Sequence, residues 1–398
     1  MTNTSKRLSR LLAVVLCGAT FFSGCSNTTD SQKVEETVPD TALELVEDMG
    51  NGWNLGNTME SVVDNGDFAT DFEQAWGNIK TTQECIDGIK GYNFKSVRIP
   101  VAWSNMMSDD GNYTINQDYF NRVDEIVDYV LNDDMYAIIN IHWDGGWWAD
   151  FGSAKQEVRD EALKKYQAMW TQIADHYKDY SKKLIFESAN EELGSKFQED
   201  NEDFTEDECY ETCNAINQEF VDIVRNSGGN NDSRFLLIAG YNTDIDMTCD
   251  DRFTMPTDTI DDHLMVSVHY YTPSQYCIAS SEGNSWGYRD SWGTPVDKAM
   301  MNANFEKMTK FTEQGYGVVI GEYGVTLKFK DGERSLKDGT FDYMQSVVNV
   351  SNDYNFCPML WDAGNWYSRT RCKFDNQELA NIYLNADGGV SQDTTVTE

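Results

Sequence analysis

The stretch Lys183-Leu-Ile-Phe-Glu-Ser-Ala-Asn-Glu191 decides the fold of this chain. Its apolar run is short and bounded by polar residues, which is typical of a buried strand whose carboxyl end leaves the core. The amide and carboxylate that follow need partners there, because a buried charge requires pairing or a shifted pKa. A similar stretch, Gly317-Val-Val-Ile-Gly-Glu-Tyr323, ends beside a second glutamate. The two stretches together predict two carboxylates on one rim.

Strand-like runs alternate with amphipathic, helix-like segments from residue 50 onward. The predicted strands are 52–55, 94–99, 136–141, 184–188, 235–239, 264–268, 318–321 and 359–361. The predicted helices include 117–132, 157–178, 206–226, 297–313 and 341–351. Repeated alternation implies parallel strands with crossover helices, and eight units predict an α/β fold, a single (β/α)8 TIM barrel. A doubly wound open sheet is the alternative, but no glycine-rich phosphate loop follows the first strand.

The amino-acid composition indicates which kinds of ligand this protein could bind. The 398 residues, 40% of them hydrophobic and only six of them proline, can bury a large core. A formal net charge of −36 argues against binding of nucleic acid or anionic membranes. Several of the eleven tryptophans stand beside Gly and Asp in polar segments. Such aromatic side chains suit a ligand with apolar faces and hydroxyl edges.

The first 41 residues have the pattern of an export signal followed by a polar segment, and we do not expect them to belong to the folded domain. In residues 1–25, cations precede an apolar run, 11–22, that is too short for a permanent membrane-spanning helix, so we expect a signal peptide. Its end, Phe22-Ser-Gly-Cys25, resembles a bacterial lipobox with Phe in place of the usual Leu. We expect lipidation of Cys25, with ordinary cleavage as the alternative. Residues 26–41 are polar and predict a flexible tether, which leaves 42–398 as one folded domain, secreted or held at the cell surface.

The cysteines predict no metal site. Nine are present, and setting aside Cys17 and Cys25 leaves seven, so at least one is free or paired between chains. Cys209 and Cys213 lie four apart in a predicted helix, a poor geometry for a disulfide. With four histidines and no CxxC pair, we expect no metal and no cofactor. A monomer is expected.

The carboxyl ends of barrel strands carry active sites, so the residues at these ends are the candidates for chemistry. In chain order they are Arg98, His142, Asn190, Glu191, His269, Tyr271, Glu322 and Trp361. Each alone has a structural explanation, such as a surface cation, a core histidine or a packed indole. Together they place a cation, imidazoles, a phenol, an amide and two carboxylates on one rim.

Two carboxylates without a metal or nucleotide motif suggest acid–base and nucleophilic attack on a glycosidic bond. A retaining reaction needs one protonated carboxyl and one ionised carboxylate, about 5–5.5 Å apart. Arg98 could keep the nucleophile ionised, and Tyr271 could donate a hydrogen bond to it. Asn190 suits the 2-hydroxyl group of a sugar. The histidines could orient these groups, and Trp361 could stack under the sugar ring.

These pieces make the chain resemble glycoside hydrolase family 5, the family of cellulases and related β-glycanases with a (β/α)8 fold. The matching segments are Gly52-Trp-Asn-Leu-Gly-Asn57, Val97-Arg-Ile-Pro100, Ile141-His142, Phe186-Glu-Ser-Ala-Asn-Glu191, Val268-His-Tyr-Tyr271, Ile320-Gly-Glu-Tyr-Gly324 and Leu360-Trp361. The resemblance covers nearly all of residues 45–385. It implies a catalytic domain in which Glu191 is the proton donor and base and Glu322 is the nucleophile. The other six candidates would support them.

Two residues depart from the family pattern. Many relatives have a proline after the acid/base residue, whereas this chain has Glu192. An anion that pointed inward there would raise the pKa of Glu191, and we expect Glu192 to be solvated instead. Many relatives also have a second histidine after the strand-3 histidine, where this chain has Trp143.

The resemblance implies an endo-β-1,4-glucanase acting on cellulose and related β-glucans. The sequence leaves open the same chemistry on mannan, xylan, xyloglucan or lichenan, and also a glycan-binding surface lipoprotein without turnover. Tryptophans on several loops predict an extended cleft for consecutive sugar rings, with packing of about half of them as the alternative. They are Trp143, Trp147, Trp148, Trp286, Trp292, Trp361 and Trp366.

Overall fold

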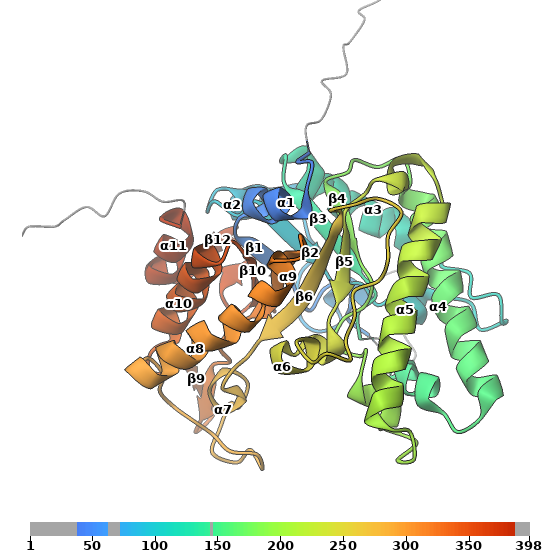
Figure 1. The fold of residues 1–398 in the computed structure, drawn as a ribbon. Coiled ribbons are helices and arrows are strands. Elements are labelled where there is room, and N and C mark those ends of the chain that lie inside the picture. Colours follow the sequence, from blue (N-terminus) through green and yellow to red (C-terminus); the bar gives the residue numbers. More distant parts are fainter. Residues whose placement is uncertain (1–37, 63–71, 144–145, 387–398) are drawn as a thin grey trace, which may run out of the picture. The chain divides into compact units, whose positions relative to one another are not determined.

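Eight parallel strands close into a barrel in the order β1-β10-β7-β6-β5-β4-β3-β2, with helices around it (Figure 1). The computed structural model describes residues 38–62, 72–143 and 146–386. The barrel strands are β1 (Gly52–Leu55), β2 (Ser96–Ile99), β3 (Tyr136–Asn140), β4 (Leu184–Glu187), β5 (Leu236–Ala239), β6 (Leu264–Tyr270), β7 (Gly317–Tyr323) and β10 (Cys357–Asp362). The predicted (β/α)8 architecture and all eight predicted strands are confirmed. The signal peptide and Cys25 lie outside the described residues.

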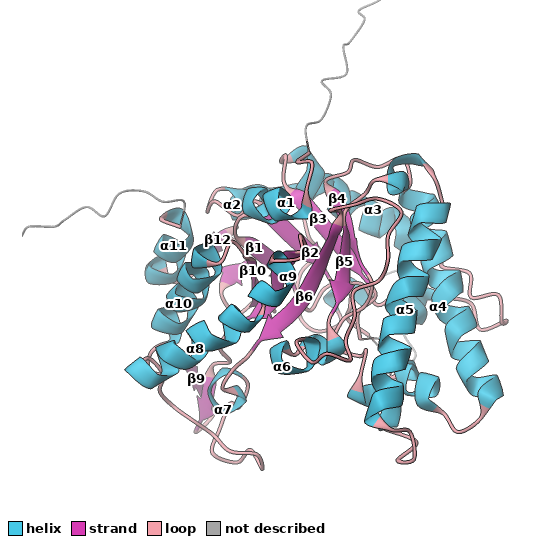
Figure 2. Cartoon of the chain, viewed as in Figure 1, coloured by secondary structure: helices cyan, strands magenta, loops and turns pink. Residues whose placement is uncertain are grey.

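Helices connect successive strands, as Figure 2 shows. The longer ones are α2 (Gln83–Lys90), α3 (Gln117–Asn132), α4 (Gln156–Tyr177), α5 (Glu206–Asn226), α8 (Pro295–Lys307), α10 (Thr340–Asp353) and α11 (Gln377–Leu384). The short ones are α6 (Ile245–Thr248), α7 (Ser274–Cys277) and α9 (Thr309–Thr312). Capping boxes at Thr205 and Thr294 begin α5 and α8. The helix predicted over 297–313 is divided into α8 and α9 at Met308, whose amide bonds back to Phe305 as a tight turn.

The loops between the barrel strands and helices contain short 3₁₀ turns and two small strand pairs. The 3₁₀ turns are η1 (Phe72–Gln74), η2 (Trp103–Met106), η3 (Trp147–Gly152), η4 (Ser195–Gln198), η5 (Gly229–Asp232) and η6 (Tyr241–Thr243). Two small antiparallel pairs, β8 (Lys328–Lys330) with β9 (Glu333–Ser335) and β11 (Tyr367–Ser368) with β12 (Lys373–Phe374), follow β7 and β10. These additions leave the barrel connectivity unchanged.

The helix α1 (Ala42–Met49) closes the amino-terminal end of the barrel. Thr41 caps its first turn by accepting a hydrogen bond from the backbone of Glu44. Its apolar face packs against strand residues inside the barrel, such as Ile138 and Ile185. Burial of this kind contributes roughly 25 cal/mol for each Å² of apolar surface removed from water. The amino-terminal end of the barrel is therefore covered by apolar packing.

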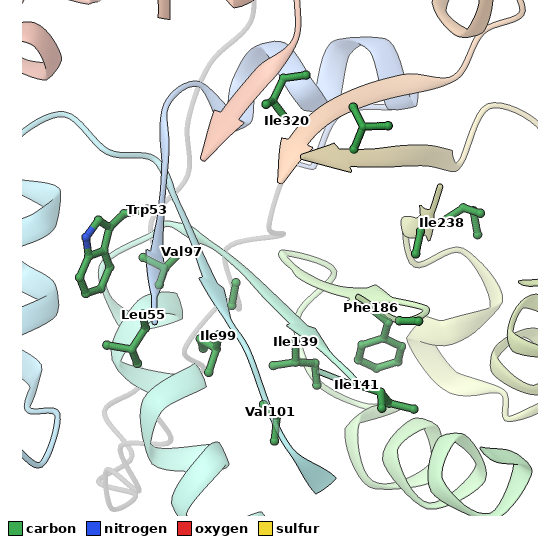
Figure 3. Close-up of a cluster of buried hydrophobic side chains, with 14 of the residues drawn as sticks. Trp53, Leu55, Val97, Ile99, Val101, Ile139, Ile141, Phe186, Ile238 and Ile320 are labelled. Carbon is green, nitrogen blue, oxygen red and sulfur yellow. The ribbon is translucent and has the colours of Figure 1, made fainter. Parts of the chain in front are cut away.

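Alternation along each strand sorts the side chains into two sets. In β4, Leu184 and Phe186 belong to the cluster that strands share with the surrounding helices, whereas Ile185 belongs to the interior cluster. Figure 3 shows part of the first set, with Phe186 near Ile139 of β3 and near Ile141, which follows that strand. The same alternation turns Glu187 into the barrel. An apolar interior layer near α1 is thus followed by a polar one near the carboxyl ends of the strands.

All seven cysteines of the described residues have free thiols, which agrees with the prediction of at least one. They are Cys85, Cys209, Cys213, Cys249, Cys277, Cys357 and Cys372. Among the described residues, none of the helices has the length and apolar character needed to cross a membrane.

Candidate active site

The two glutamates predicted from the strand ends lie next to each other at the carboxyl rim of the barrel. Glu322 stands in β7, and Glu191 follows β4 by four residues. His269 lies between them, with its Nδ1 2.7 Å from Glu191 Oε1 and 3.7 Å from Glu322 Oε2. One oxygen of each glutamate and one ring nitrogen all lie within 4.8 Å of one another. This agrees with the short carboxyl separation, about 5–5.5 Å, of retaining glycosidases.

Arg98 joins these groups from below. It is fully buried, and alternation along β2 points it into the barrel. Its Nη1 donates to Glu322 Oε1 at 2.8 Å and to Asn54 Oδ1 at 3.0 Å. Its Nη2 donates to Asn190 Oδ1 at 2.8 Å. Arg98 therefore fixes both the carboxylate of Glu322 and the amide that precedes Glu191.

The second carboxylate on Arg98 is Glu187, a residue that sequence reasoning did not single out. Its Oε2 accepts a hydrogen bond from Arg98 Nε at 2.6 Å, and both side chains are fully buried. The other oxygen, Oε1, has no hydrogen-bond partner among the described residues. The alternation Leu-Ile-Phe-Glu in β4 was the available signal, because it places Glu187 on the interior face with Ile185.

Glu322 is the more deeply held of the two rim glutamates. Its Oε2 accepts a hydrogen bond from the Tyr271 hydroxyl at 3.0 Å. Burial raises the pKa of Glu322, and the charges of His269 and Arg98 offset this only in part. The charge of Arg98 acts in the expected direction, since it lowers the pKa of Glu322 against the effect of burial.

Glu191 behaves in the opposite way. Its side chain is 51% exposed toward the rim. Burial of its inner part raises the pKa of Glu191, but the hydrogen bond and charge of His269 outweigh that effect and lower it overall. The pKa of His269 shifts in the complementary direction. Burial lowers it, but the charges of Glu322 and Glu191 together raise it above the ordinary value. In the open site the proton thus favours the imidazole over Glu191.

His142 is held as a neutral imidazole that accepts a hydrogen bond at Nδ1 and carries its proton on Nε2. Asn140 Oδ1 accepts from the backbone of Val101, so its amide nitrogen is the donor to His142 Nδ1 at 3.2 Å. Burial, together with the charges of Arg98 and His269, lowers the pKa of His142 well below its ordinary value. Its ring stacks on Trp361 with centroids 5.9 Å apart and planes 7° from parallel. All eight predicted site residues are thus on the same rim.

The two departures from the family pattern have different surroundings. Trp143 is 41% exposed. Glu192 is only 5% exposed, so the expectation that it is solvated is wrong. It lines a pocket together with Glu191 and Trp143.

The predicted ring of tryptophans is only partly present. Trp148, Trp292 and Trp366 are buried and pack within the loops, as the alternative expectation had it. Trp148, for example, lies against Trp147 and Phe151. Trp143 and Trp286 are exposed at 41% and 46%.

One group of side chains among the described residues could hold a metal ion, and it is the set Glu191, His269 and Glu322. Arg98 donates to one of these carboxylates at 2.8 Å and would repel a cation there. The donor set fits acid–base chemistry better than metal binding.

A closed parallel barrel whose carboxyl rim carries two neighbouring carboxylates, with a histidine between them and an arginine on one of them, is the arrangement expected of a glycoside hydrolase. Comparison with known families agrees. The family model Cellulase (glycosyl hydrolase family 5) matches residues 61–366, and the chain belongs to this family.

Individual relatives are endoglucanases by name. Endoglucanase A of Paenibacillus barcinonensis is 35% identical over 390 residues, which cover 92% of each chain. A xyloglucan-specific endo-beta-1,4-glucanase of Bacteroides ovatus is 33% identical, covering 81% of this chain and 65% of the relative. A solved GH5-4 broad specificity endoglucanase from an uncultured bovine rumen ciliate is 34% identical with a TM-score of 0.76, covering 88% of this chain and 99% of that one.

The opposite surroundings of the two site histidines make a first prediction. Nitrogen-15 NMR of the four imidazoles should show His142 neutral throughout the range of folding, and His269 titrating above its ordinary pKa. Glu191→Gln removes one of the carboxylates that raise the pKa of His269, so the titration midpoint should fall. A midpoint unaffected by this substitution would contradict the bridge between Glu191 and His269.

Proposed function

We propose that this protein is a retaining endo-β-1,4-glucanase that hydrolyses internal bonds of cellulose and related β-glucans. One observation carries the proposal: Glu191 and Glu322 face the same space, with an oxygen of each within 4.8 Å of the other and His269 between them. The named relatives support the reaction class.

In the first step, an oxygen of Glu322 attacks the anomeric carbon and forms a glycosyl ester. The bond from that carbon to the leaving sugar oxygen breaks, and Glu191 gives its proton to the oxygen. Glu191 must therefore be protonated when substrate is bound. A sugar over the half-exposed Glu191 excludes water, which raises the pKa of this carboxyl above that of the open site.

In the second step, the Glu191 carboxylate takes a proton from water, whose oxygen attacks the anomeric carbon and releases Glu322. The ester has no negative charge on Glu322. Loss of that charge lowers the pKa of Glu191 and suits its change from acid to base. Two displacements at the same carbon restore the original configuration.

The surrounding side chains serve the two glutamates. Asn190 accepts from Arg98 through its oxygen, which leaves its amide NH₂ as the donor for the 2-hydroxyl of the sugar. Tyr271 and Arg98 donate to Glu322 and orient it for attack. Trp361, with His142 stacked on it, offers an apolar face beneath the ring.

Substitution of each glutamate should separate the two roles. Glu322→Ala should lower kcat by at least about 10⁴-fold, because no ester can form. Glu191→Ala should lower it by about 10²–10⁴-fold on substrates that need an acid. With an activated aryl cellobioside and added azide, Glu322→Ala should yield the α-glycosyl azide and Glu191→Ala the β-glycosyl azide. Circular dichroism controls for folding, and near-normal turnover by Glu322→Ala would refute the assignment.

The polymer is tested by a substrate panel. Exposed Trp143 and Trp286 offer faces on separate loops, which suits an open cleft and attack within a chain. We expect the viscosity of carboxymethylcellulose to fall sharply while few reducing ends appear. The relative named for xyloglucan makes xyloglucan the first alternative, with lichenan, mannan and xylan beside it. A slow decline of viscosity in parallel with reducing ends, or activity on mannan alone, would count against the proposal. No turnover on any polymer would favour a binding protein.

The proposed location is the bacterial cell surface, through a lipidated Cys25. The support is sequence alone: an apolar run, Gly24-Cys25 and a polar tether. Cys25→Ser should move the enzyme from the membrane fraction into the medium or slow its processing. Equal membrane association of variant and wild type would contradict lipidation.

A further inference from the structure

A third carboxylate, that of Glu187, lies inside the barrel, and the reaction steps described above do not use it. Glu187 is the last residue of β4, and alternation along this strand turns it inward. Its Oε2 accepts a hydrogen bond from Arg98 Nε at 2.6 Å, and both side chains are fully buried. Its other oxygen, Oε1, has no hydrogen-bond partner among the described residues. The carboxylate therefore depends on Arg98.

The hydrogen bond to Arg98 does not by itself require a carboxylate at position 187. The amide oxygen of a glutamine could accept from the same Nε, and removing an amide from water costs less than removing a carboxylate. A glutamine would lack only the negative charge. The charge of Glu187 therefore needs an explanation beyond orientation of the arginine.

The neighbouring strands supply no other charge to Glu187. In the strand register it lies between Asn140 of β3 and Leu237 of β5, and neither side chain is ionisable. Burial and nearby cations lower the pKa of His142, which follows β3, well below its ordinary value, so this ring is neutral as well. Arg98 is thus the cation that compensates Glu187.

The same guanidinium also holds the nucleophile of the proposed reaction. Arg98 Nη1 donates to Glu322 Oε1 at 2.8 Å. The other ionisable groups that face Glu322 are Tyr271, at 3.0 Å, His269, at 3.7 Å, and Glu191. Arg98 therefore pairs with two carboxylates, of which only Glu322 changes its charge during the reaction.

This charge change makes the second carboxylate of Arg98 important. The argument rests on the proposed function, in which Glu322 forms a glycosyl ester. The ester carries no charge, so Glu322 no longer compensates Arg98 in the intermediate. A buried guanidinium without a counter-ion is strongly destabilising. Glu187 keeps its charge in both steps, because it touches neither the sugar nor the attacking water.

We propose that Glu187 is a positioning residue for the reaction, acting as the permanent counter-ion of Arg98. It allows Glu322 to exchange its charge for an ester bond while the cation beside it stays compensated. With a neutral residue at position 187, Arg98 would favour the ionised form of Glu322. Formation of the ester would then become slower and its breakdown faster.

A reagent that traps the ester measures these two steps separately. 2,4-Dinitrophenyl 2-deoxy-2-fluoro-β-cellobioside loses dinitrophenolate without a proton from Glu191, so the rate of inactivation reports attack by Glu322. The return of activity, after excess reagent is removed, reports release of the ester by water. Glu187→Gln keeps the acceptor for Arg98 Nε and removes the charge. We expect inactivation to slow by roughly tenfold and reactivation to become severalfold faster, because loss of a nearby unit charge changes a pKa by about one unit.

Two matched variants control for structural damage. Glu187→Asp keeps the charge and should restore both rates toward the wild-type values. Asp258→Asn removes a carboxylate that accepts from Arg225 Nε at 2.7 Å, and this buried pair at the end of α5 is not part of the site. Both rates should be unchanged in that variant. Circular dichroism confirms folding.

A purely structural role for Glu187 would slow both steps together. Any pattern in folded Glu187→Gln other than slower inactivation with faster reactivation would overturn the proposal for Glu187 alone. Failure of the reagent to label Glu322 in the wild-type protein, checked by mass spectrometry of peptides, would instead overturn the proposed function.

The wild-type protein offers a second test that does not depend on the folding of a variant. Carbon-13 NMR of protein labelled at the glutamate carboxyl groups should show Glu187 ionised both before and after trapping. Two labelled carboxyl groups lie against the Arg98 side chain, and the one that becomes an ester identifies Glu322. The other belongs to Glu187. A protonated carboxyl at Glu187 in either state, at the pH of activity, would overturn its role as counter-ion.

Discussion

The buried guanidinium of Arg98 is the interaction on which the rest of the site depends. A charge inside a barrel is costly unless it is paired and hydrogen-bonded, and Arg98 meets that condition with Glu187 and Glu322. Its other bonds go to Asn54 on β1 and Asn190 beyond β4. One side chain therefore links four parts of the barrel. Without it, Glu187 would lose the hydrogen bond to its Oε2, and Glu322 would keep only Tyr271 and His269 as partners.

His269 pairs with carboxylates at the rim, as Arg98 does inside the barrel. Arg98 compensates the charges of Glu187 and Glu322 inside the barrel. The His269 imidazole lies 2.7 Å from the Glu191 carboxylate and also faces Glu322. The pKa of Glu322 is raised and the pKa of Glu191 is lowered in the protein without substrate, where water reaches Glu191. In the proposed reaction, a sugar over Glu191 would exclude water from the more exposed of the two carboxyl groups and so raise the pKa of Glu191.

Most of the barrel could be predicted because parallel strands are continuous apolar runs, and the eight rim residues could be predicted because strand ends carry chemistry. Glu187 was missed although the alternation in β4 places it inside. The break at Met308 and the burial of Glu192 depend on how loops and helices pack, which local pattern does not encode. Trp148, Trp292 and Trp366 show the same limit, since an indole beside glycine can serve packing or binding.

The central claim is that Glu322 and Glu191 lie close enough for a covalent, two-step reaction. Proton NMR of the first product released from a cello-oligosaccharide tests it most directly, before the new reducing end equilibrates. An oxygen of Glu191 lies within 4.8 Å of an oxygen of Glu322, and so short a separation suits direct attack by Glu322 rather than by a water that it activates. The β-anomer should therefore appear first. An α-anomer at the earliest times would mean inversion and would contradict the account.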